Sequence, residues 1–153
     1  MRFGRATSAV LAVAVLVVGC GGAGADLFVV TRSGQGPGAA LTLRVSDDGF
    51  VRCNGGPRRR ITDDQLLLAR EIQRELDDMA KRSYPPGPTS VFRYRVRLDS
   101  GTIAFSDTSP GIPAELRKAA AFTREVATGA CRLPVRNSSI SSISASWSPH
   151  HGR

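Results

Sequence analysis

The segment Val91–Asp107, VFRYRVRLDSGTIAFSD, decides the fold of this chain. Its first half alternates between an apolar and a basic series, which predicts a strand with one buried face. The apolar series is Phe92, Tyr94, Val96 and Leu98, and the basic series is Arg93, Arg95 and Arg97. Asp99–Gly101 predicts a turn into a returning strand. The arginines therefore face water, either as a solvated surface or as a binding surface for an acidic partner.

The flanking segments predict three more strands and two helices. The strands are expected at Asp26–Arg32, Leu41–Val45 and Phe50–Cys53, with a flexible loop at Ser33–Ala40. A capping box at Thr62–Gln65 opens a helix expected to end near Arg82, and a second helix is expected at about 113–128. The order β-β-β-α-β-β-α predicts an α+β domain: an antiparallel sheet of about five strands with both helices on one face.

The N-terminus has the pattern of an export signal. Arg2 and Arg5 precede an apolar run, Ala9–Val18, whose ten residues span only about 15 Å as a helix, too short for a bilayer. The run ends in VVGC, which resembles a bacterial lipobox. It predicts a signal peptide at 1–19, a lipid on Cys20, a linker at 20–25 and an extracytoplasmic domain anchored to the cell membrane. The alternative is an ordinary secretory signal with an incidental cysteine.

The other two cysteines, Cys53 and Cys131, form an even pair in a chain expected to be exported. An oxidising compartment favours a disulfide between them, and two buried free thiols are the alternative. The domain is then expected at 26–131. The following segment, 132–153, is rich in serine without periodicity and is predicted to be disordered.

The net charge of +8 does not indicate a nucleic-acid-binding protein once it is divided along the chain. Residues 26–131 hold 16 basic and 13 acidic side chains, so the domain is only mildly basic. Export also separates the protein from most nucleic acid, and we expect no such partner.

The sequence predicts neither an enzyme nor a metal or cofactor site. Both histidines, His150 and His151, lie in the serine-rich tail, so the domain lacks a histidine for nucleophilic catalysis or metal binding. Asp47–Asp48 suits a turn, and Asp63–Asp64 suits the start of a helix.

Arg58, Arg59 and Arg60 form the densest charge cluster. They are expected in a loop just before the first helix. The cluster is either a solvated loop or a contact with anionic lipid head groups or cell-wall polymer.

Several of these segments together resemble the emfourin family of small proteinaceous inhibitors of thermolysin-like metallopeptidases. The matching parts are TRSG at Thr31–Gly34, the acidic-capped helix, the FRYRVRLDSGTIAFSD hairpin and PAELRKA at Pro113–Ala119. The resemblance covers about 27–128 and implies an α+β fold that blocks a peptidase cleft. The loop SGQGPGAA lacks the family's Gly-Gly-Phe-Ala-Gly type run, and the cysteine pair and lipid anchor are additions.

The leading hypothesis from the sequence is a lipid-anchored, non-enzymatic, protein-binding domain, with a peptidase or another envelope protein as its partner. Its candidate contacts are Ser33, Gly34, Gln35 and Gly36 in the loop, and Asp99 and Gly101 in the turn. The competing hypothesis is an envelope-associated lipoprotein that touches anionic lipid or polymer through Arg58–Arg60 and the Arg93, Arg95 and Arg97 series.

Overall fold

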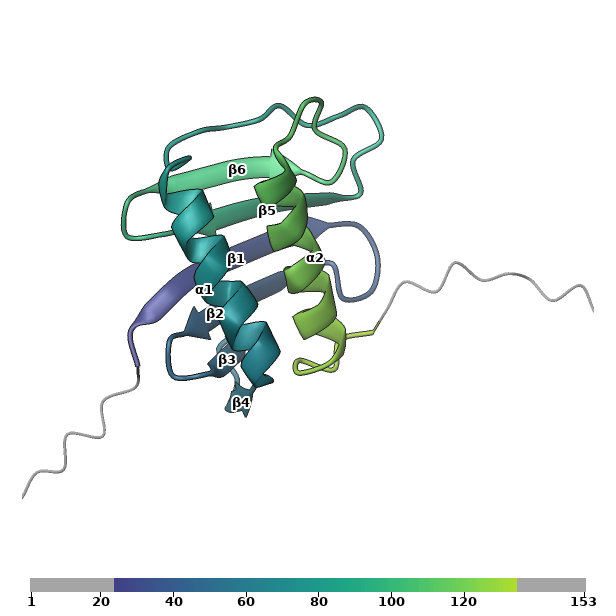
Figure 1. Ribbon diagram of the computed structural model, residues 1–153. Helices are drawn as coiled ribbons and strands as arrows, with labels where there is room; N and C mark the ends of the chain where they lie inside the picture. The colour runs from purple at the N-terminus through teal and green to yellow at the C-terminus, as the bar shows by residue number, and fades with distance from the viewer. Residues whose placement is uncertain (1–23, 135–153) are drawn as a thin grey trace, which may run out of the picture.

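The computed structural model describes residues 24–134, so Cys20, the signal segment and most of the predicted tail lie outside the described residues. The element order is β1 (Asp26–Gly34), β2 (Leu41–Ser46), β3 (Phe50–Cys53), β4 (Arg58–Arg60), α1 (Asp63–Asp77), β5 (Phe92–Arg97), β6 (Thr102–Ser106) and α2 (Ala114–Thr128). The strands form one antiparallel sheet in the order β4-β3-β2-β1-β5-β6. Both helices lie across the same face of it (Figure 1). The predicted α+β class is confirmed.

The sheet has six strands rather than about five, because Arg58–Arg60 forms strand β4 instead of a loop. Asn54 and Gly55 have positive φ values of 52° and 73°, and the chain reverses there after Cys53. This tight reversal brings Arg58 opposite Arg52 and lets the segment add to the sheet edge.

Helix α1 ends at Asp77 and not near Arg82 as expected. Beyond it the chain turns, with Lys81 at a φ of 74°, and runs beside β6. The amide of Tyr84 donates to the carbonyl of Ala104, whose amide donates to the carbonyl of Arg82. Pairing with the sheet edge therefore competes successfully with the last helical turn. The capping box at the other end is present, with Thr62 and Gln65 bonded reciprocally.

The core fills the space between the sheet and the two helices. Tyr94, Val96 and Ile103 are buried on this face, as the alternation in the hairpin predicts. Helix α2 presents Leu116, Phe122 and Val126 to the sheet, and every one of these three side chains is at most 1 % exposed. The helices are also joined at their outer edge, where Lys118 Nζ lies 2.7 Å from Glu71 Oε1 and 2.8 Å from Glu75 Oε1. Because one sheet face carries the core, the other is left to solvent.

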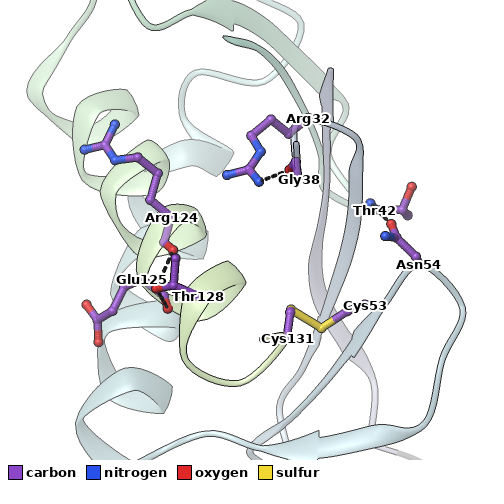
Figure 2. The surroundings of a disulfide bond; sticks show 9 residues. All are labelled: Arg32, Gly38, Thr42, Cys53, Asn54, Arg124, Glu125, Thr128 and Cys131. Atoms are coloured by element: carbon purple, nitrogen blue, oxygen red, sulfur yellow. Dashed lines mark hydrogen bonds between the residues drawn. A yellow bond between two sulfur atoms is a disulfide. The ribbon is translucent and has the colours of Figure 1, made fainter. Parts of the chain in front are cut away.

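The predicted disulfide is present between Cys53 and Cys131. It joins the end of β3 to the turn that follows α2 (Figure 2). The two residues are 78 positions apart, so the bond fixes the last helix to the far half of the sheet.

Replacing both Cys53 and Cys131 by serine should lower the free energy of unfolding by about 4–5 kcal/mol, because the unfolded chain regains the entropy of a 78-residue loop. Urea unfolding of the oxidised protein and of the double variant measures the difference. Reduction of the unaltered protein is the matched control and should give the same loss. A loss below about 1 kcal/mol would contradict the entropic account.

Candidate functional site

The sheet face opposite the helices carries seven arginines, and we call it the arginine face. Directly paired residues of antiparallel strands project from the same side of a sheet, so the register assigns each one. Val51 and Val96 point into the core, which places their strand neighbours on the open side. The arginines of this face are Arg44, Arg52, Arg58, Arg60, Arg93, Arg95 and Arg97. Two clusters that lie far apart in the sequence thus belong to one surface.

Four of these arginines lie in one row across the sheet. Arg58 pairs with Arg52, and Arg52 pairs with Arg44. Val29 of β1 pairs with Arg44 on one side and with Arg97 on the other. With strands about 4.8 Å apart, the row from Arg58 to Arg97 is about 19 Å long. Like charges directly opposite each other destabilise a sheet, so this arrangement costs folding free energy.

The arginines of the face differ in how their charge is balanced. Arg44 Nε lies 3.4 Å from Asp26 Oδ2, Arg60 Nη2 lies 3.5 Å from Asp63 Oδ1, and Arg58 pairs with Asp48. By contrast, the other four arginines are exposed and form no ion pair with any residue between 24 and 134: Arg52, Arg93, Arg95 and Arg97. Asp26 and Asp99 line a small cavity together with Arg97 but do not pair with it. The half of the face nearest β5 therefore carries three arginines without an ion-pair partner.

A groove runs over this half of the face. One part, about 290 Å³ in volume, is lined by Arg93, Arg95, Thr31, Ser33, Tyr84 and Pro86, among others. The adjoining part, about 250 Å³, shares Ser33 and Arg93 and adds Gly34 and Gln35. No carboxylate lines either part. The structure thus brings the loop candidates Ser33, Gly34 and Gln35 together with two arginines of the hairpin.

The other candidate contact residues, Gly36, Asp99 and Gly101, do not line this groove. Gly36 is exposed, and a side chain added there would meet no atom within 4 Å. Ser33 pairs with Arg93 near one end of β5, whereas the Asp99–Gly101 turn follows Arg97 at the other end. The loop and the turn therefore lie at opposite ends of β1, a strand of nine residues, or about 26 Å. They do not form one contiguous contact surface.

The flexible loop predicted at Ser33–Ala40 begins later than expected, because Ser33 and Gly34 end β1 and pair with β5. The rest of the loop is not a free arm, because Arg32 holds it. The Arg32 side chain is 6 % exposed. Its Nη2 donates to the carbonyl of Gly38 at 2.6 Å and its Nε to the carbonyl of Ala39 at 3.3 Å. Figure 2 shows the Arg32–Gly38 bond. The loop is therefore positioned by a buried side chain of the strand that precedes it.

The chain enters the domain beside the arginine face. The amide of Gly24 donates to Asp48 Oδ2 at 3.0 Å, and the same oxygen accepts from Arg58. The bond from Gly24, followed by the contact with Arg58, holds the pKa of Asp48 below its usual value. The Asp47 amide also donates to the carbonyl of Ala25. The segment that follows Cys20 in the sequence thus reaches the sheet next to the row of four arginines.

Sequence reasoning missed Arg44 and Arg52, which connect the two clusters. The signal was present in LTLRVS and FVRC, where each arginine stands between apolar residues of an alternating strand. Arg59 belongs elsewhere: it pairs with Val51, whose side chain is in the core, so it projects from the helix side at the sheet edge.

Within the described part of the chain, no three histidine, cysteine, aspartate or glutamate side chains are grouped as metal ligands would be. Among the same residues, no helix combines the length and apolar character that crossing a membrane requires.

Replacing Arg52 by threonine should stabilise the domain by about 0.5 kcal/mol in low salt, because it removes two like-charge cross-strand neighbours and keeps a residue favoured in strands. Urea unfolding at low and at high ionic strength measures this, and salt should shrink the gain. Arg74→Thr on α1, away from the row, is the control and should not stabilise. A destabilised Arg52 variant in low salt would show that the row is not repulsive.

The assignments of this site rest on its geometry alone, because comparison with known proteins adds nothing to them. No family model matches the chain, and neither a curated protein nor a solved structure matches it. The resemblance to emfourins therefore stays a prediction from short motifs.

Proposed function

We propose that this protein is a lipid-anchored, extracytoplasmic, non-enzymatic domain whose arginine face lies on the anionic phospholipid surface of the membrane that holds its anchor. The observation that carries the proposal is the row from Arg58 to Arg97, four arginines in register on one sheet face. A surface that costs folding stability is expected to serve binding, since a countercharged partner removes the repulsion.

The path of the chain favours the membrane as that partner. Residues 20–25 span at most about 20 Å when extended, so a lipid on Cys20 keeps the domain close to the bilayer. Gly24 is bonded beside Arg58, which puts the start of this short tether at the edge of the arginine face. The two helices, which cover the opposite face, would then point away from the membrane.

The strength of the contact fits a tethered domain. A basic residue near an anionic bilayer contributes about 1 kcal/mol, so the three unpaired arginines of β5 supply about 3 kcal/mol. That corresponds to a dissociation constant weaker than 1 mM for a free domain. A lipid anchor makes docking intramolecular, at an effective concentration in the millimolar range. Docking of the domain on the membrane therefore requires both the lipid anchor and the arginines.

At about 10 mM accessible lipid, the mature chain from Cys20 onward, without its lipid, should co-sediment in part with phosphatidylglycerol vesicles and not with neutral phosphatidylcholine vesicles, as a dissociation constant weaker than about 1 mM implies. Arg95→Gln/Arg97→Gln should lower the partition coefficient about 30-fold, the equivalent of about 2 kcal/mol. Arg74→Gln/Arg117→Gln, which removes the same charge from the helix side, should change it less than about threefold.

Three results would count against the proposal: equal binding to neutral vesicles, equal losses in the two double variants, or binding that persists unchanged at high salt. Tight binding to a soluble anionic polymer with no binding to vesicles would assign the face to cell-wall polymer instead.

Stoichiometric inhibition of a peptidase, one form of the protein-binding hypothesis from the sequence, receives less support. An inhibitor presents one contiguous surface to a cleft, whereas the loop and the Asp99–Gly101 turn lie at opposite ends of β1. Titration of thermolysin with the oxidised mature chain at moderate salt tests this directly. We expect full activity at a large molar excess, and a stoichiometric loss of activity would restore the inhibitor hypothesis.

A further inference from the structure

A second cavity lies on the helix side of the sheet, away from the arginine face. It has a volume of about 180 Å³ and opens between the end of α2, the loop after β1 and the Leu133–Pro134 segment. Phe92, Ala127, Leu133 and Pro134 give it largely apolar walls, and its two charged side chains are Arg32 and Arg124. Arg32 extends from β1 toward the helix that carries Arg124 (Figure 2).

Arg32 is a buried cation whose partners are all neutral. It donates to the carbonyls of Gly38 and Ala39, and its guanidinium carbon lies 4.9 Å from the centre of the Phe92 ring. Burial, the largest effect on it, lowers its pKa below the usual value. No carboxylate forms an ion pair with it in the part of the chain from 24 to 134. A buried charge without a counter-charge is costly, so an anion in the cavity would interact favourably with Arg32.

Neither guanidinium group of the cavity forms an ion pair with a carboxylate of the described chain. The nearest acidic residue along α2, Glu125, does not line the cavity and instead accepts from Gln65 Nε2 of α1 at 2.6 Å. Guanidinium groups are the usual partners of a carboxylate. The apolar walls, by contrast, favour a hydrocarbon group.

We propose that this cavity binds a small apolar carboxylic acid, with its carboxylate between Arg32 and Arg124 and its hydrocarbon part against Phe92, Ala127 and Leu133. The volume holds about six water-sized groups and is smaller than a drug-sized site, so the ligand is an acid of roughly the size of benzoate. Inorganic phosphate would satisfy the arginines but leave the apolar walls uncovered.

This site is independent of the membrane contact, because the helices and the arginines of the open face lie on opposite sides of the sheet. A domain docked through Arg95 and Arg97 would still present the cavity to solution. The two proposals can therefore fail separately.

Sodium benzoate is the probe, added to the oxidised mature chain and followed by NMR chemical shifts and by the thermal unfolding midpoint. We expect saturable shifts confined to residues around the cavity, a dissociation constant of about 1 mM or tighter, and a raised midpoint. Benzyl alcohol, which keeps the ring without the charge, and inorganic phosphate, which keeps the charge without the ring, should each bind at least about tenfold more weakly.

Variants separate a binding role from a structural one. Arg124→Gln should weaken benzoate binding at least about tenfold, while Arg117→Gln, on the same helix outside the cavity, should leave it unchanged. Arg124→Gln should also leave the midpoint of the ligand-free protein nearly unchanged, because Arg124 is exposed and forms no ion pair with a described residue.

The proposal is overturned if benzoate causes no saturable shift up to solubility-limited concentrations, or if phosphate binds as well as benzoate. It is equally overturned if Arg124→Gln lowers the midpoint of the ligand-free protein without affecting benzoate affinity, since the guanidinium group would then have a purely structural role.

Discussion

The structure depends on one constraint: both helices pack on a single face of an antiparallel sheet. Side chains in a strand alternate between faces, so every second residue of each strand is committed to the core and its neighbours are committed to solvent. In β5 this separates Tyr94 and Val96 from Arg93, Arg95 and Arg97. Shifting the register by one residue would bury three arginines, and the pairing is accordingly well specified.

The same constraint produces a molecule with two different sides. The open side is an array of arginines in which charge repulsion is tolerated between Arg44, Arg52 and Arg58. The helix side is apolar inside and carries the cavity with Arg32 and Arg124. The disulfide and the Arg32 contacts hold the segments around that cavity in place, from the loop after β1 to the turn after α2. One side suits an extended anionic surface, and the other suits a small ligand.

Local patterns in the sequence predicted most of the fold. The alternation in Val91–Asp107, the capping box at Thr62 and the cysteine parity each state a physical preference that needs no distant residue. Two errors occurred at the edges of the sheet, where pairing with an edge strand competes with local structure. The sequence predicts a loop at Arg58–Arg60, but these residues pair with β3 as strand β4. It predicts helix after Asp77, but the chain turns there and runs beside β6. Edge pairing depends on a neighbouring strand that is remote in the sequence.

The candidate sites were less predictable for the same reason. By itself, the sequence determined which residues alternate, where helices begin, that Arg93, Arg95 and Arg97 share one side of a strand, and that the cysteines could pair. Only the tertiary structure decided that Arg44 and Arg52 join the clusters into one row, that Ser33 and Asp99 lie at opposite ends of β1, and that Arg32 is buried beneath α2. Strand order and register set which surfaces are shared, and these are chosen by the packing of the whole chain.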